Sequence, residues 1–224
     1  MKERVKIDLS ALLIVILATT FVYFCRNFYP TSRGIDRIFD FLGIIAILKG
    51  TLLRMAARGH KKAHSQKGSS LVMTGPYTIV RNPMYLGSLM IGSGFVLIIW
   101  PWWFVFIFGA FFYLRFKAQI ASEEGWLSEH FKDVYTAYCQ KVPRLFPSIK
   151  QAIQIKMKDA FDPIETFSTK EKYGLMAWPL LGLMFGLIQE RIIYQSMDVG
   201  ASILTLVLAG VVFFIGIVIL YKFA

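Results

Sequence analysis

The sequence predicts an all-α membrane protein with about six transmembrane helices. Hydrophobic residues make up 56% of its 224 positions and charged residues only 17%, a composition typical of membrane proteins rather than soluble domains. The apolar residues gather into long uncharged runs, of the length that a helix needs to cross a bilayer. The formal net charge is +11, and the bases lie between the runs, as expected for loops on the cytoplasmic side.

This basic excess does not indicate a nucleic-acid-binding protein. The bases are confined to loops, where they orient the chain and attract anionic headgroups. We therefore expect membrane lipids around the protein and no nucleic-acid partner. Cys25 and Cys139 fall on segments predicted to lie on opposite sides of the membrane, so we expect no disulfide between them.

Residues 1–58, the N-terminal part of the chain, are predicted to contribute two transmembrane helices. Residues 9–25 are uncharged and end without a small-residue cleavage site, which favours a retained membrane helix over a signal peptide. Residues 35–57 form a second span, although charged residues lie near both of its ends. Lys49 can reach the interface by extending its side chain.

Residues 82–114 predict a tight helical hairpin. They run 33 positions without a charge, and one straight helix of that length would measure about 50 Å, too long for a hydrocarbon core of roughly 30 Å. Pro101 stands near the middle, between tryptophans that favour the membrane interface. On the first arm, Gly87, Gly92 and Gly94 would let another helix approach closely.

Beyond the hairpin, basic and apolar segments alternate. Residues 115–140 predict a helix that leaves the membrane, and residues 148–160 an amphipathic helix on its surface. Residues 173–189 and 199–221 are two further uncharged runs, joined by a short turn. The positive-inside rule then places both termini in the cytoplasm. The small size of the chain leads us to expect a bacterial plasma membrane.

The segment 71–87 is the most informative stretch. Gly75 and Pro76 are a turn signal, and Pro83 is well placed in the first turn of a helix. The chain is therefore expected to turn, run extended and enter the membrane as a helix. Backbone N–H groups at such a helix start suit an anionic group, and Arg81 flanks that point.

Glu123 and Glu124 are the acids that follow the hairpin most closely, about two helical turns beyond it. This position predicts that they lie at the membrane interface, near segment 71–87. The alternative interpretation is an ordinary pair of surface charges, since acids favour the first turn of a helix. In the same way, Tyr77 and Tyr85 have an alternative interpretation as tyrosines of the interfacial belt.

These residues fall into two motifs. The first reads Gly-Pro-Tyr-x-x-x-Arg-Asn-Pro-Met-Tyr-x-Gly from Gly75, and the second reads Glu-Glu-x-x-Leu-x-x-x-Phe-x-x-x-Tyr-x-x-Tyr-x-x-x-Val-Pro-Arg-x-x-Pro from Glu123. In this order, separated by one uncharged hairpin, they resemble the signatures of the isoprenylcysteine carboxyl methyltransferase family and of the phospholipid N-methyltransferases in the same superfamily. We treat residues 59–147 as the methyltransferase core, and residues 148–224 as a basic interfacial segment with two C-terminal helices.

The resemblance implies a methyltransferase that uses S-adenosylmethionine and acts on a lipophilic acceptor or a lipid-modified substrate. It places the cofactor pocket at the cytosolic interface. A carboxylate facing aromatic rings suits the sulfonium and ammonium groups of this cofactor. Including the neighbouring Arg81 and Glu123, the expected cofactor-binding residues are Leu71, Val72, Tyr77, Arg81, Asn82, Pro83, Met84, Tyr85, Glu123 and Glu124.

Two positions depart from the isoprenylcysteine pattern. Asn82 stands where that family usually has histidine, and asparagine cannot act as a base near neutral pH. Gln119 stands where the family often has an arginine near the methyl acceptor, while Arg115 is close but on another face of the helix. A carboxylate acceptor is therefore in doubt, and a lipid amine, thiol or phenol is more plausible. The expected catalytic residues are Glu124, Gln119 and Arg115.

The sequence is open to three further interpretations. His60 and His64 have the spacing of two metal ligands on one helix face, but no third ligand of matching spacing is visible, so we predict no metal site. An intramembrane NADPH-dependent reductase is the first alternative function, because the sterol reductases resemble this superfamily in their membrane core. A non-enzymatic scaffold or small transporter is the second. Cofactor preference in a binding assay separates these functions.

Overall fold

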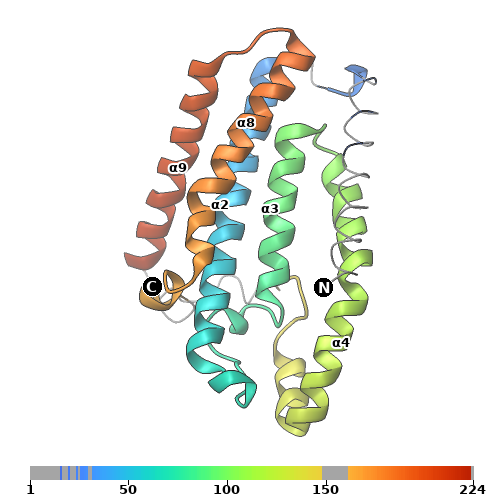
Figure 1. Cartoon of the computed structure of the whole chain (residues 1–224), viewed down its shortest axis with the longest axis vertical. Coiled ribbons are helices and arrows are strands. Elements are labelled where there is room, and N and C mark those ends of the chain that lie inside the picture. Colours follow the sequence, from blue (N-terminus) through green and yellow to red (C-terminus); the bar gives the residue numbers. More distant parts are fainter. Residues whose placement is uncertain are drawn as a thin grey trace.

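The computed structural model describes residues 16, 20, 24, 26–29, 32–147 and 161–222, and five long helices dominate this part of the chain (Figure 1). They are α2 (Arg33–His64), α3 (Pro83–Ile99), α4 (Phe104–Lys141), α8 (Gly174–Tyr194) and α9 (Val199–Lys222). The short elements are η1 (Arg26–Phe28), η2 (Gln66–Gly68), η3 (Gly75–Thr78), α7 (Pro163–Thr166) and η4 (Lys170–Tyr173). These described ranges contain no strand.

The all-α membrane architecture is confirmed. Three helical segments are long and apolar enough to cross a membrane, namely Phe104–Lys141, Lys170–Tyr194 and Val199–Leu220, and α3 is a shorter apolar helix. The predicted span 35–57 lies within α2. This helix has 32 residues and is more polar than the other four long helices. The number of six spans and the cytoplasmic termini remain predictions. The predicted helices at 9–25 and 148–160 lie outside the described residues, apart from isolated positions in the first.

The predicted hairpin is present. Helix α3 ends at Ile99 and α4 begins at Phe104, with Pro101 fully buried in the turn between them. The two helices stand side by side in Figure 1 and join at its upper end. Helix α4 has 38 residues and continues well past the start of α3 at the lower end. Its backbone breaks at Lys132, where φ is 40° and ψ is −119°.

Helices α2 and α3 approach closely because glycines face one another across their contact. A Cβ atom on Gly50 would lie 2.6 Å from the carbonyl oxygen of Gly87, and one on Gly43 would lie 2.7 Å from that of Gly94. The two pairs are seven residues apart on each helix, so they fall on one face. Gly92 instead faces the Phe108 ring of α4. All three predicted contact glycines of the hairpin's first arm therefore sit at close helix contacts.

Helices α8 and α9 complete the bundle on the other side of α2 (Figure 1). The uncharged run predicted at 199–221 falls within α9, and the run predicted at 173–189 falls within α8 except for its first residue, which ends η4. A four-residue turn separates the two helices. One hydrophobic core joins the N-terminal and C-terminal parts of the chain. It consists of Ile44, Ile47, Leu48, Ile98, Ala209 and Phe213.

Candidate active site

Two neighbouring cavities lie where α2, α3 and α4 meet near the lower end of the bundle. The larger cavity has a volume of about 530 Å³ and the smaller cavity about 270 Å³. They share Lys61, Trp126 and Leu127 as lining residues. The other residues of the larger cavity are Arg54, Met84, Tyr85, Ser88, Ser122 and Glu123. Those of the smaller cavity are Ser65, Gly68, Ser70, Leu71, Val72, Tyr77, Arg81, Asn82, Phe131, Tyr135 and Tyr138.

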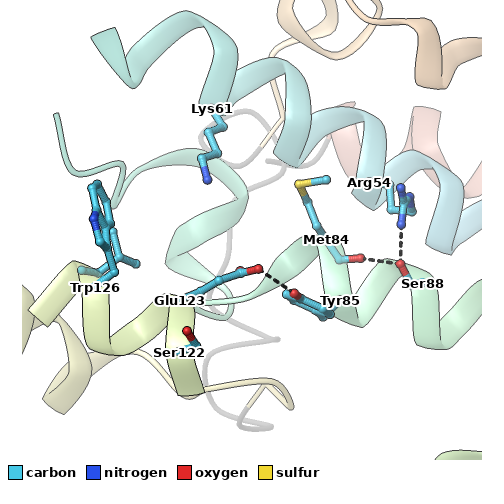
Figure 2. Close-up of a pocket in the computed structure, with 9 residues that line it drawn as sticks. Arg54, Lys61, Met84, Tyr85, Ser88, Ser122, Glu123 and Trp126 are labelled. Atoms are coloured by element: carbon cyan, nitrogen blue, oxygen red, sulfur yellow. Dashed lines mark hydrogen bonds between the residues drawn. The ribbon is translucent and has the colours of Figure 1, made fainter. Parts of the chain in front are cut away.

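The larger cavity brings an acid and a phenol together. The Tyr85 hydroxyl, near the start of α3, donates a hydrogen bond of 2.8 Å to Glu123 Oε1 on α4, as Figure 2 shows. The Gln119 amide, one turn earlier on α4, donates to the same oxygen at 3.3 Å. From the opposite wall, the Lys61 side chain of α2 points into the space between Trp126 and Met84 (Figure 2). Acid, phenol and ammonium thus surround one space.

Arg54 supplies a second cation to the larger cavity from within α2. Its guanidinium donates a hydrogen bond to the Ser88 hydroxyl on α3 and forms an ion pair of 3.1 Å with Glu171 of η4. The same Glu171 oxygen pairs with Arg58, one turn further along α2, at 2.7 Å. Half-buried charges of this kind are stable because each has a bonded partner. The C-terminal half of the chain therefore helps to fix one wall of the cavity.

The smaller cavity is lined by aromatic rings of the second motif. Phe131 lies before the break at Lys132, and Tyr135 and Tyr138 lie after it. The three rings pack together with Leu127 in one hydrophobic cluster. The Tyr138 hydroxyl donates a hydrogen bond of 2.7 Å to the backbone carbonyl of Tyr77 in η3. This bond fixes the first motif against the second and closes the cavity on one side.

Glu124 links the two motifs. Its carboxylate accepts a hydrogen bond of 2.9 Å from the Asn82 amide and lies 2.9 Å from Arg144 Nε. Arg81 Nη1 lies 3.7 Å from the same carboxylate. Asn82 also donates to the Arg144 carbonyl at 3.1 Å. One carboxylate thus serves two guanidinium groups and one amide, which are the partners that a buried charge requires.

The charge states around Glu124 follow from these contacts. Burial acts to lower the pKa of Arg81, but the Glu124 carboxylate opposes it, and the net pKa lies above the usual arginine value. Burial raises the pKa of Tyr77, whose hydroxyl bonds to the Ala57 carbonyl at 3.4 Å. Arg81 is therefore a permanent cation and Tyr77 a neutral phenol near neutral pH.

The structure distributes the predicted site residues among several positions. The smaller cavity receives Leu71, Val72, Tyr77, Arg81 and Asn82. The larger cavity receives Met84, Tyr85 and Glu123. Pro83 is fully buried in the first turn of α3 and lines neither cavity. Glu124 lines neither cavity, and its carboxylate lies against Asn82, Arg81 and Arg144.

Gln119 and Arg115 line neither cavity. Gln119 reaches the site only through its bond to Glu123. The Arg115 guanidinium lies 5.3 Å from the centre of the neighbouring Phe116 ring. Sequence reasoning missed Lys61 and Trp126, for which no pattern gave a signal. It also missed the role of Arg144, although that residue belongs to the second motif.

The smaller cavity fits a cofactor with an aromatic ring and an anionic group. Its aromatic lining can stack on an adenine ring or lie against a sulfonium. Arg81 supplies a cation whose Nε atom is buried and has no hydrogen-bond partner within the described residues. Lys61 adds a second cation at the border of the two cavities. These donors suit the carboxylate of an amino-acid group.

Comparison with known proteins agrees with the geometry. The family model for phospholipid methyltransferases matches residues 41–134, which take in most of α2, the hairpin and α4 as far as Val134. No solved structure matches the chain. The match begins within α2, so α2 is part of the segment that carries the family's sequence pattern. The family match confirms the resemblance to the superfamily of membrane methyltransferases that includes the isoprenylcysteine and phospholipid enzymes.

Proposed function

We propose that the protein transfers a methyl group from S-adenosylmethionine to a lipophilic acceptor at the membrane interface. The observation that carries this proposal is the meeting of the two motifs at Asn82, Glu124 and Arg144, beside two cavities that share a wall. A transferase for two substrates needs two binding spaces that meet at one point. The family match favours methyl transfer over the reductase and scaffold alternatives.

The smaller cavity is the proposed cofactor site. S-adenosylmethionine, when bound, supplies a methyl group already activated by its sulfonium. The residues that would hold it are Tyr77, Arg81, Asn82, Phe131 and Tyr135, which offer aromatic faces and hydrogen-bond donors. Glu124 then acts as a positioning residue, because its charge is already shared by Arg81, Arg144 and Asn82. This differs from the direct cofactor contact that the resemblance implies.

The larger cavity is the proposed acceptor site. Met84, Tyr85 and Glu123 line it, and we therefore place them on the acceptor side of the wall rather than in the cofactor pocket. The Glu123 carboxylate can hold the acceptor's nucleophilic group and accept its proton. Trp126 and Leu127 line both cavities where these meet, and they would shield the reacting groups from water once both substrates are bound. Gln119 orients Glu123 through its hydrogen bond, and Arg115 lines neither cavity.

We infer that this end of the bundle faces the cytoplasm. The residues around it include Arg54, Arg58, Lys61, Lys62 and Arg81, and the basic residues between α2 and α3 have no acid among them. The positive-inside rule assigns such a segment to the cytoplasmic side. A bacterial plasma membrane remains the expected location.

The first test is binding of S-adenosylhomocysteine to detergent-purified protein by titration calorimetry. We expect the unmodified protein to bind. Glu124→Gln should bind at least about tenfold more weakly, because it removes the carboxylate that positions Arg81 and Asn82 in the smaller cavity, and a charge-assisted bond within the protein is worth roughly 1.5–3 kcal/mol. Glu129→Gln is the matched control, since Glu129 is an exposed acid of the same helix. Each variant is first shown to be folded by its thermal unfolding. A folded protein that binds no S-adenosylhomocysteine would refute the proposal, and NADPH would then be titrated.

The acceptor class is tested separately, with the cofactor radiolabelled in its methyl group. Lipids that present an amine, a carboxylate, a thiol or a phenol are supplied in mixed micelles. We expect label to move into an amine, thiol or phenol acceptor in preference to a carboxylate, because the Glu123 carboxylate in the larger cavity would repel an anionic acceptor and the Arg54 guanidinium is already paired with Glu171. Transfer to a carboxylate lipid alone would overturn this preference, but it would leave the proposed use of S-adenosylmethionine intact.

A further inference from the structure

Helix α2 carries two histidines that meet a distant acid. His60 and His64 lie on one face near the helix end, and their ring centres are 4.1 Å apart. Glu165, in the short helix α7, reaches both rings. Its Oε2 atom lies 2.6 Å from His60 Nδ1, and its Oε1 atom lies 2.8 Å from His64 Nε2. More than one hundred residues separate the acid from the histidines in sequence.

The chain is built to place Glu165 at this point. A Cβ atom on Gly59 would lie 1.9 Å from the Glu165 carbonyl oxygen, so only a glycine allows the backbone of α7 to come this close to α2. Asp162 caps α7, and its Oδ1 atom accepts a hydrogen bond of 2.9 Å from the Glu165 amide. The close backbone contact and the helix cap together hold the Glu165 side chain against two imidazoles, so Glu165 differs from an ordinary solvated surface acid.

The remaining nitrogen of His60 is also held. His60 Nε2 lies 2.8 Å from the Thr74 hydroxyl, directly before the first motif. Gly75 packs on the ring itself, because a Cβ atom there would lie 2.8 Å from two ring atoms. Metal-binding histidines characteristically bond their second nitrogen to a neighbouring oxygen, which fixes the ring and its tautomer. Only about an eighth of the His60 side chain is exposed.

We propose that His60, His64 and Glu165 form a binding site for a divalent transition metal such as Zn²⁺. The three ligand atoms lie within 4.8 Å of one another, while a tetrahedral zinc ion with bonds of about 2.0–2.2 Å needs ligands roughly 3.3 Å apart. Small side-chain rotations bring the three atoms to that spacing. Two histidines and one carboxylate leave a fourth position for water. The metal would replace the two hydrogen bonds that Glu165 now accepts.

Such a metal would connect three parts of the molecule. It would join the end of α2 to α7, and through Thr74 it would hold the turn that begins the first motif. Lys61 faces the cavities, and its position next to His60 places it on another side of the helix. The proposed role is therefore structural support beside the active site, and it does not depend on the identity of the methyl acceptor.

The test uses full-length protein without a polyhistidine tag, stripped with a chelator and dialysed. Zn²⁺ binding is measured by calorimetry, and Co²⁺ is added as a probe whose visible absorption reports tetrahedral nitrogen and oxygen ligands. We expect one equivalent to bind, and His64→Ala and Glu165→Gln each to weaken binding at least about a hundredfold, since even outer-shell changes cost 10–100-fold. His64 is half exposed, so its replacement leaves the fold intact.

His130→Ala is the matched control, because His130 lies on α4 against Trp126. It should retain the binding of the unmodified protein. Zn²⁺ should also raise the thermal unfolding temperature of the unmodified and His130→Ala proteins, and not that of His64→Ala. The site would be overturned by absence of stoichiometric binding, or by variants His64→Ala and Glu165→Gln that bind as tightly as the unmodified protein. Either result would leave a hydrogen-bonded triad without metal.

Discussion

Two adjacent acids of one motif have different surroundings. Glu124 accepts a hydrogen bond from Asn82, and its negative charge is balanced by the neighbouring Arg81 and Arg144 guanidinium groups. Glu123 faces the larger cavity, and its hydrogen-bond donors among the described residues, Tyr85 and Gln119, are both neutral. A buried charge with two cationic partners organises structure, whereas a carboxylate with neutral partners can still receive a proton or bind a cation.

This difference predicts separate effects of two isosteric substitutions. Glu123→Gln should leave the affinity for S-adenosylhomocysteine within about threefold, because no bonded partner is a charge, but it should lower the rate of methyl transfer at least tenfold, as expected for loss of a general base. Glu124→Gln should weaken cofactor binding, as argued above. Calorimetry and a methyl-transfer assay on the same samples measure both quantities. Equal loss of affinity in the two variants would contradict the assignment of Glu123 to the acceptor side.

The sequence predicted this site in outline and not in its pairings. The motif residues do gather around two cavities, because both motifs begin or end at the hairpin that brings them together. The pairing of Glu124 with Arg144 was not predictable, since it depends on how the chain returns after α4. Glu165 was equally hidden, because a ligand from a distant segment has no spacing rule to reveal it.

At the scale of elements, the contact between α2 and α3 decides where the cavities form. The facing glycines let the two backbones approach to a distance that side chains would prevent. Arg54 and Lys61 on α2 are then brought opposite Met84 and Tyr85 on α3. The walls of the larger cavity thus depend on residues that have no side chain.

We therefore expect Gly50→Ala to destabilise the protein. The new Cβ atom would lie 2.6 Å from the Gly87 carbonyl oxygen and 2.9 Å from the Ile91 amide nitrogen, and backbone atoms cannot rotate away. Overpacking of this kind typically costs about 1–3 kcal/mol. Gly109→Ala on α4 is the control, because nothing lies within 4 Å of the new atom. Thermal unfolding in detergent should show a lower midpoint for Gly50→Ala alone, and an unchanged midpoint would argue against the close contact.

The elements differ in how far sequence could define them. Pro101 and the length of the uncharged run located the hairpin correctly, because a proline and a bilayer thickness are strong constraints. The break at Lys132 carries no proline or glycine to announce it. Helix α2 extends seven residues past the predicted end at residue 57, since His64 and its neighbours are stabilised by α7 and not by their own hydropathy.

At the scale of the whole molecule, the C-terminal helix pair packs against the segment that the phospholipid methyltransferase model matches. It lies outside the family match, yet both of its ends are tied to α2. Glu171 binds Arg54 and Arg58 near the cavities. At the opposite end of the bundle, Asp198 pairs with Arg37 at 2.8 Å. These ties make α8 and α9 a support for α2, and hence for one wall of the larger cavity.

Two neighbouring phenylalanines of α9 test this support. Phe213 is 5% exposed and belongs to the core with Ile44, Ile47 and Ile98, whereas Phe214 is 61% exposed on the outer side. In a bilayer or micelle the hydrophobic effect between helices is small, so packing itself holds them. Phe213→Ala removes that packing and leaves a cavity, and we expect a loss of about 2–4 kcal/mol.

Phe214→Ala, which removes the same atoms from a surface that faces lipid or detergent, should change stability by less than about 0.5 kcal/mol. Thermal unfolding of the two variants measures the difference. The affinity for S-adenosylhomocysteine, measured well below the unfolding temperature, should stay unchanged in both, because neither residue lines the two cavities. Equal stability of the two variants would mean that the packing of α9 against the bundle contributes little to the stability of the protein. Loss of cofactor binding in folded Phe213→Ala would instead show that α9 acts on the site through α2.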